Sequence, residues 1–91
     1  MISLSTHVLD TSAGRPASGV RVELLGVGAA TTDADGRARL ADGLAPGEYV
    51  LVFHPPSPFF RRVELTIALE DGHYHVPLLV SPYGCASYRG S

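Results

Sequence analysis

The chain contains no lysine, and its seven basic residues are all arginines scattered along 91 positions. A clustered basic stripe, which is the electrostatic footprint of nucleic-acid binding, is therefore excluded. The single cysteine, Cys85, excludes an internal disulfide and a structural zinc cluster of the usual cysteine-rich kind. No apolar run approaches the roughly 18 residues of a membrane span, and the first residues do not resemble a signal peptide. We therefore expect a cytoplasmic protein that binds neither nucleic acid nor membrane.

The length predicts one small domain, residues 1–91. A chain of this size buries only about 60–65% of its unfolded surface, so its own core is marginal. Only 18% of the residues are charged, which is low for a globular surface. Association between copies would add buried area to such a core, and the low charge is consistent with it.

Helical periodicity is also absent, and apolar residues instead recur at every second position. Residues 63–69 give the clearest example, with Val63, Leu65, Ile67 and Leu69 on one face. Similar alternation covers 20–24, 49–53 and 74–80, and turn residues separate the runs. Residues 33–36 (Asp-Ala-Asp-Gly) predict a hairpin turn. Short alternating runs between turns predict an all-β sandwich of about seven to eight strands.

Histidines lie on the less hydrophobic face of two of these predicted strands. His7 shares its face with Ser3 and Ser5, and His75 shares its face with His73 and Pro77. A single histidine on the outer face of a strand is usually only solvated. Residue pattern alone therefore leaves the function of these histidines open.

Motifs in the middle and toward both ends of the chain support a family resemblance. The middle, residues 14–53, contains Thr-Thr-Asp-x-Asp-Gly-Arg and Leu-x-Pro-Gly-x-Tyr-x-Leu-x-Phe, which look like the prealbumin-type sandwich and indicate fold without activity. The ends are more specific: Thr6-His7-Val8-Leu9-Asp10, His73-Tyr74-His75-Val76-Pro77-Leu78-Leu79, and Tyr88-Arg89-Gly90-Ser91. Together they resemble the transthyretin-like family, and within it the 5-hydroxyisourate hydrolase branch, over nearly the whole chain.

The chain departs from the family pattern at Cys85, where a tyrosine is usual, at Ala86, which replaces a small hydroxyl residue, and most of all between two strands. Family members carry a short helix between the strand ending here at Phe53 and the one starting near Phe60. This chain has only residues 54–59 there, with prolines at 55, 56 and 58. Three prolines remove three ladder donors and exclude a central strand. The resemblance therefore implies that the helix is deleted and replaced by a proline-rich turn.

The resemblance implies hydrolysis of 5-hydroxyisourate to 2-oxo-4-hydroxy-4-carboxy-5-ureidoimidazoline in urate catabolism. As a cyclic amide hydrolase, the enzyme must deprotonate a water and stabilise an oxyanion. Neutral imidazole suits the first task near pH 7, and a guanidinium suits the second. The implied catalytic residues are His7, Arg37, His75 and Ser91, with His7, Arg37 and Tyr88 contacting the substrate. Which histidine is the general base stays open.

Arg39, near Arg37, and His73, near His75, are weaker candidates for catalytic residues. Arg39 shares a face with Arg37 but lacks its position directly after Asp-Gly, and His73 is interpreted as peripheral. No metal and no cofactor are expected, because the implied reaction needs neither. The family also packs two dimers face to face around a channel, which implies a homotetramer built as a dimer of dimers.

Other functions remain compatible with these residues. The middle motifs alone would suit a non-catalytic module that binds a small ligand, or an interaction domain with an exposed sheet edge. A hydrolase scaffold that has lost activity or changed substrate is a third alternative. Two imidazoles and a guanidinium on one face favour the hydrolase.

Overall fold

The computed structural model describes residues 1–90, and Ser91, a predicted catalytic residue, lies outside this range. The described residues form strands and turns without a helix, as predicted. The nine strands slightly exceed the predicted seven to eight because β2 is only two residues long. They are β1 (Ile2–Asp10), β2 (Arg15–Pro16), β3 (Arg21–Leu24), β4 (Gly28–Thr31), β5 (Arg37–Leu44), β6 (Gly47–Phe53), β7 (Val63–Leu69), β8 (Gly72–Ser81) and β9 (Gly84–Ser87).

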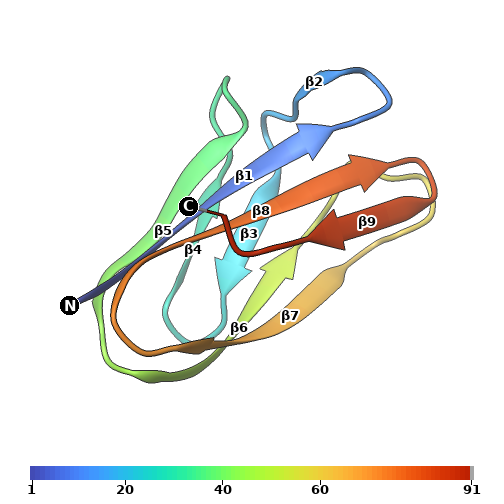
Figure 1. Cartoon of the computed structure of the whole chain (residues 1–91). Coiled ribbons are helices and arrows are strands. Elements are labelled where there is room, and N and C mark those ends of the chain that lie inside the picture. The colour runs from blue at the N-terminus through green and yellow to red at the C-terminus, as the bar shows by residue number, and fades with distance from the viewer. Residues whose placement is uncertain (91) are drawn as a thin grey trace.

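Two sheets pack face to face, as Figure 1 shows. One has the order β2-β1-β8-β9, with β5 also paired to β1, and we call it the five-stranded sheet. The other has the order β4-β3-β6-β7 and is called the four-stranded sheet. The predicted β-sandwich is thereby confirmed. Within residues 1–90, no helix is long and apolar enough to cross a membrane.

Strand β1 organises the five-stranded sheet because it has neighbours along both edges. One edge pairs with β8 in parallel over the whole length of β1. The other edge is shared: β5 pairs antiparallel from Ile2 to His7, and β2 pairs beyond it at Leu9 and Asp10. Residues from three distant parts of the chain therefore meet on one sheet face.

The core lies between the sheets and uses the apolar positions that the alternation predicted. Leu4 and Val8 of β1, Leu78 of β8, and Leu51 and Phe53 of β6 are all buried within one cluster. Thr6 also faces inward, fully buried, and its hydroxyl donates to the Val76 carbonyl at 2.6 Å. A buried hydroxyl needs such a partner. The residues alternating with these on β1 and β8 therefore point outward.

The connection between β6 and β7 is the proline-rich turn that the sequence predicted. Residues 54–62 contain neither helix nor strand. Ser57 closes the turn, because its Oγ accepts hydrogen bonds from the backbone N–H groups of Phe59 and Phe60 and donates to the Pro82 carbonyl. The last of these bonds ties the shortened segment to the β8–β9 turn.

The turn predicted at 33–36 exists, but it does not form a hairpin. Strand β4 before it belongs to the four-stranded sheet, and β5 after it belongs to the five-stranded sheet. The tight turn that Asp-Gly predicts is therefore confirmed, and the predicted hairpin is wrong. A turn signal constrains local backbone geometry and does not say which sheet the next strand joins.

Candidate active site

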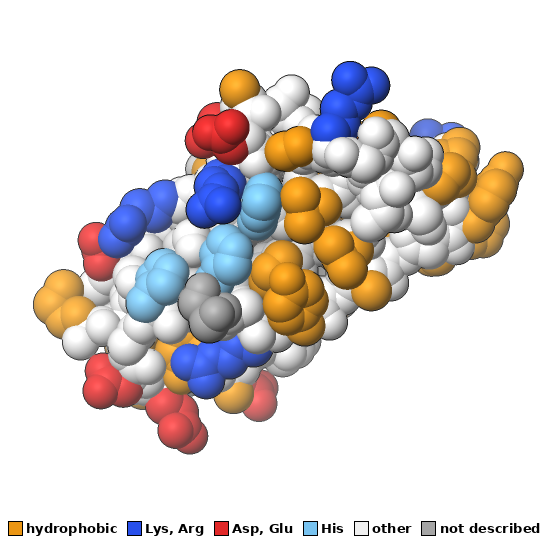
Figure 2. Space-filling view, turned by 45° about the horizontal axis from the view of Figure 1, so that its top comes forward, with side chains coloured by type: hydrophobic (Ala, Val, Ile, Leu, Met, Phe, Trp, Pro, Cys, Tyr) orange, Lys and Arg blue, Asp and Glu red, His pale blue; other side chains and the backbone are white. Residues whose placement is uncertain are grey.

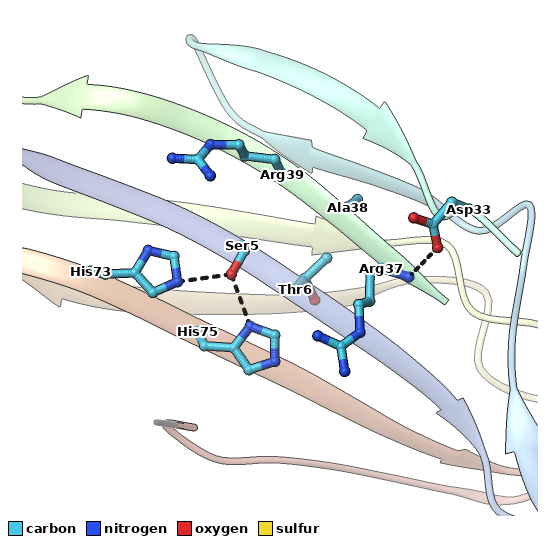
Figure 3. A pocket seen from close by; sticks show the side chains of 8 residues that line it. All are labelled: Ser5, Thr6, Asp33, Arg37, Ala38, Arg39, His73 and His75. Atoms are coloured by element: carbon cyan, nitrogen blue, oxygen red, sulfur yellow. Dashed lines mark hydrogen bonds between the residues drawn. The ribbon is translucent and has the colours of Figure 1, made fainter. Parts of the chain in front are cut away.

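A groove of about 410 Å³ lies on the outer face of the five-stranded sheet. Figure 3 shows its lining, which comes from β1, β5, β8 and the turn before β5. The lining residues are Ser5, Thr6, Asp33, Arg37, Ala38, Arg39, His73 and His75. In Figure 2, histidine side chains gather on this face next to arginine. The lining is rich in imidazole and guanidinium groups and suits a polar or anionic ligand.

Strand register brings three predicted catalytic residues together. Arg37 is the direct antiparallel partner of His7, and His75 is the parallel partner of Ser5, two residues before His7. The imidazole rings of His7 and His75 have centroids 6.4 Å apart. In Figure 3 the Arg37 guanidinium points across β1 toward His75. His7, His75 and Arg37 thus form one cluster, although they are far apart in sequence.

The turn before β5 fixes both Arg37 and His7. The Asp33 carboxylate accepts hydrogen bonds from the backbone N–H groups of Asp35 and Arg37, and the Arg37 bond is the largest cause lowering the pKa of Asp33. Gly36 has a φ of +74°, and a Cβ there would come within 2.5 Å of the Val8 carbonyl oxygen. Only glycine lets the turn lie this close to β1.

The same turn selects a tautomer of His7. Its Nε2 lies 2.8 Å from the Asp35 carbonyl oxygen, which can only accept a hydrogen bond. Nε2 therefore carries the proton, and in the neutral ring the lone pair is on Nδ1. The His7 ring is half-buried and therefore partly shielded from solvent. The hydrogen bond to Asp35 holds it in one orientation.

His75 has no carboxylate partner within residues 1–90 and is bound by a hydroxyl instead. Its Nδ1 lies 2.8 Å from Ser5 Oγ. Burial is the main cause that lowers the pKa of His75, and the nearby His7, Arg37 and His73 lower it further. Both effects disfavour the imidazolium. His75 is therefore kept neutral, as a general base at neutral pH requires.

The chain end runs back along β8 and reaches His75. The Gly90 N–H donates to the His75 carbonyl at 2.7 Å, and the two residues form an isolated antiparallel bridge. A Cβ at position 90 would lie 2.8 Å from Cδ2 of the His75 ring. Glycine is therefore the residue that lets this segment pass beside the imidazole.

Tyr88 lies away from this groove. It lines a second cavity of about 600 Å³ beside β7, together with Tyr74 and Arg89. The Arg89 guanidinium covers the Tyr74 ring at 4.2 Å from its centroid, a cation–π contact. Substrate contact by Tyr88 stays a prediction, as does catalysis by Ser91, which lies outside the described residues.

Two residues that the sequence did not single out as functional take part in this cluster. Ser5 contacts both His73 and His75, and His73, interpreted above as peripheral, lines the groove. The available signal was that Ser3 and Ser5 share the outer face with His7. Within residues 1–90, no group of three or more potential ligands is placed to hold a metal ion.

Comparison with known proteins supports the family resemblance. Residues 4–90 match the model of the HIUase/transthyretin family. The chain belongs to this family. It is 44% identical to a 5-hydroxyisourate hydrolase of Caulobacter vibrioides over 115 residues, which cover all of both chains. Since this chain has only 91 residues, that relative carries residues without a counterpart here.

Solved structures agree with this membership. The 5-hydroxyisourate hydrolase of Klebsiella pneumoniae superposes with a TM-score of 0.89 at 36% identity, covering 100% of both chains. Sea bream transthyretin in complex with thyroxine superposes with a TM-score of 0.82, covering 96% of this chain and 93% of its own. Its identity is only 24%, so that likeness concerns the fold alone.

Proposed function

We propose that the protein hydrolyses 5-hydroxyisourate to 2-oxo-4-hydroxy-4-carboxy-5-ureidoimidazoline in urate catabolism. The observation that carries the proposal is a cluster in which Arg37 and His75 line one groove and His7 lies beside them, in a family member whose similar relatives are named 5-hydroxyisourate hydrolases. A binding protein would need shape and hydrogen bonds, whereas a hydrolase needs a neutral base beside a fixed cation.

The proposed reaction is that of a cyclic amide hydrolase. A histidine takes a proton from water, and the water oxygen bonds to a ring carbonyl carbon. Arg37 stabilises the oxyanion that forms, because its charge is fixed where negative charge develops. The carbon–nitrogen bond of the ring then breaks, and the nitrogen receives the proton that the histidine holds.

Both histidines have features that suit proton transfer. His75 is kept neutral by burial and by neighbouring cationic groups, and its Nε2 has no hydrogen-bond partner within residues 1–90. His7 presents Nδ1, because its Nε2–H donates to the Asp35 carbonyl. We assign the base to His75 and place His7 beside it to orient water or substrate.

Assembly and location complete the proposal. Strands β7 and β9 are at sheet edges and the groove is open on one side, so a homotetramer, a dimer of dimers, would enclose the site. Sedimentation at micromolar concentration should give four times the chain mass, and a monomer would contradict this. A cytoplasmic location, catalysis by Ser91 and substrate contact by Tyr88 remain parts of the proposal.

The decisive experiment follows ultraviolet absorbance of 5-hydroxyisourate after urate oxidase has consumed the urate. The protein should accelerate its loss well beyond the spontaneous rate. Arg37→Lys keeps the charge but loses the planar fork, and we expect about 10²–10³-fold lower kcat. Arg21→Lys, on the other sheet, is the matched control. A folded tetramer that gives no acceleration would contradict the proposal and favour a ligand-binding function.

A further inference from the structure

A continuous row of hydrogen bonds runs along the outer face of β1 and β8. Ser3 Oγ lies 2.6 Å from His73 Nδ1, and His73 Nε2 lies 3.1 Å from Ser5 Oγ. Ser5 Oγ then lies 2.8 Å from His75 Nδ1. Figure 3 shows the last two of these bonds converging on the Ser5 hydroxyl. We call this row, Ser3–His73–Ser5–His75, the serine–histidine row.

Parallel strand pairing produces the row directly. Ser3 is the register partner of His73, and Ser5 is the register partner of His75. Side chains at every second position share a face, so a Ser-x-Ser strand lies beside a His-x-His strand with hydroxyl and imidazole groups alternating. Both ring nitrogens of His73 bond to serine, and one ring nitrogen of His75 does.

The donors and acceptors of the row admit two consistent arrangements. A serine hydroxyl has one proton, and a neutral imidazole has one N–H and one lone pair. In the first arrangement His75 Nδ1–H donates to Ser5, the Ser5 hydroxyl donates to His73 Nε2, and His73 Nδ1–H donates to Ser3. In the second, every bond is reversed. The first arrangement leaves His75 Nε2 with a lone pair facing the groove.

We propose that the serine–histidine row is a proton relay that releases one proton to solvent at Ser3 when His75 takes a proton from water in the groove. This proposal rests on the proposed hydrolase function and extends it to Ser3, Ser5 and His73. These three are positioning and relay residues, whereas His75 meets the reacting water.

The transfer is balanced at each atom. Water gives a proton to His75 Nε2 as its oxygen bonds to the carbonyl carbon, and His75 Nδ1 releases its proton to Ser5 Oγ. The Ser5 hydroxyl proton moves to His73 Nε2, the His73 Nδ1 proton moves to Ser3 Oγ, and the Ser3 proton leaves to solvent. His75 is then neutral again with Nε2 protonated, ready to donate to the ring nitrogen. After His75 has donated its Nε2 proton to the ring nitrogen, a proton from solvent enters at Ser3 and each bond of the row reverses. This restores the first arrangement.

Burial and charge along the row suit this direction. The bond between Ser5 and His75 is partly buried, whereas the two bonds made by His73 are exposed. The proton therefore moves outward, from a shielded ring to one in contact with water. A carboxylate beside His75 would hold the imidazolium in place by its charge, whereas a hydroxyl passes the proton on.

The kinetic test removes the links one at a time in the full-length protein. Ser5→Ala should lower kcat by roughly 10- to 100-fold with little change in KM, since the relay assists general-base catalysis without binding substrate. Ser5→Thr keeps the hydroxyl and should restore most of the rate. His73→Gln can still hydrogen-bond to Ser5 but cannot pass a proton on, so it should lose about tenfold. The controls are Ser57→Ala and His54→Gln, which lie outside the row and should stay within about twofold.

A spectroscopic test keeps the relay separate from the proposed function. Nitrogen-15 chemical shifts of the ring nitrogens report the tautomer of each histidine in the folded protein, whether or not it turns over 5-hydroxyisourate. Coupling through Ser5 predicts that His73→Gln changes the balance between Nδ1–H and Nε2–H at His75. Unchanged His75 shifts in His73→Gln would overturn the relay. Two kinetic results would also overturn the relay. One is a kcat within twofold of wild type for both Ser5→Ala and His73→Gln, and the other is a lowered kcat in Ser5→Ala with an unchanged kcat in His73→Gln.

Discussion

Histidines lie at the outer faces of both sheets, in opposite chemical surroundings. On the five-stranded sheet, His75 bonds to the hydroxyl of Ser5 and lies near Arg37 and two other imidazoles. Beside the four-stranded sheet, His54, which directly follows β6, lies 2.6 Å from the carboxylate of Glu23 on β3, and Glu23 also faces Arg21 at 3.7 Å. One face holds neutral partners and cations, and the other pairs opposite charges.

The difference separates the proposed reactive surface from a surface of paired charges. Glu23, Val52 and Glu64 form a row across β3, β6 and β7, and Val52 is fully buried although it faces away from the core. Both glutamates beside it are ion-paired, Glu64 with Arg62 at 2.7 Å. Charges that are already paired leave little capacity for proton transfer. The groove on the other sheet leaves its imidazoles available.

Replacement of one histidine on each face should give the largest contrast. His75→Ala removes the proposed general base and should lower kcat about 10²–10⁴-fold. His54→Ala removes an imidazole that only pairs with Glu23, so turnover should stay near that of wild type. The assay is loss of 5-hydroxyisourate absorbance at equal concentrations of folded protein. Similar losses in both variants would show that the two faces do not differ in this way.

A methyl group at position 90 should damage the site by displacement alone. Gly90→Ala places a Cβ 2.8 Å from Cδ2 of His75, so the ring or the chain end must move. A displacement approaching 1 Å can cost on the order of 10²-fold in rate, and we expect about 10- to 100-fold lower kcat. Gly28→Ala is the matched control, because its Cβ meets no atom within 4 Å. Normal kcat in Gly90→Ala would contradict the tight packing against His75.

The acidic limb of the pH profile should distinguish His75 from an ordinary histidine. Its pKa is lowered from 6.5, chiefly by burial, so the neutral base persists below pH 6.5. As pH falls further, through the lowered pKa, His75 becomes protonated and kcat/KM decreases. Measurement of kcat/KM from pH 8 downward, with an NMR titration of the His75 ring, tests this. An acidic limb centred at or above pH 6.5 would be inconsistent with the lowered pKa.

The smallest effect concerns stability and the paired face. The hydrogen bond from His54 is the main cause lowering the pKa of Glu23 below 4.5. The pKa of this carboxyl is lower in the folded state than in the unfolded state, so its ionisation stabilises the fold at pH values above the unfolded-state pKa. This stabilisation is lost as the pH falls through the folded-state pKa. Glu23→Gln should therefore lower Tm by at most a few degrees at pH 7, because the pair is exposed. Turnover should not change.

Calorimetry at two pH values checks this last prediction. The Tm difference between Glu23→Gln and wild type should shrink once the pH is well below 4.5, where the carboxyl is protonated in both states. Glu48→Gln serves as the control, since Glu48 makes no salt bridge within residues 1–90. A Tm difference that grows in acid would contradict the linkage.

Much of the fold could be predicted because alternation is a local property. Period-two patterns placed His7 and His75 on outer faces, and the three prolines at 55, 56 and 58 excluded a central strand there. Register between distant strands was not readable from spacing. A shift of one residue between β1 and β8 would separate Ser5 from His75, and the whole fold determines that register. For the same reason, the contact between His73 and Ser5 was missed.

The Ser5–His75 bond joins residues 70 positions apart, so the site cannot form until both segments have been made. During synthesis β1 emerges first and must wait for β8, which follows several seconds later at usual rates of about 5–20 residues per second. A nascent chain that ends before β8 therefore lacks one half of the proposed base assembly. If His75 is the base, activity first arises when β1 and β8 meet, and turnover then reports that this pairing is complete.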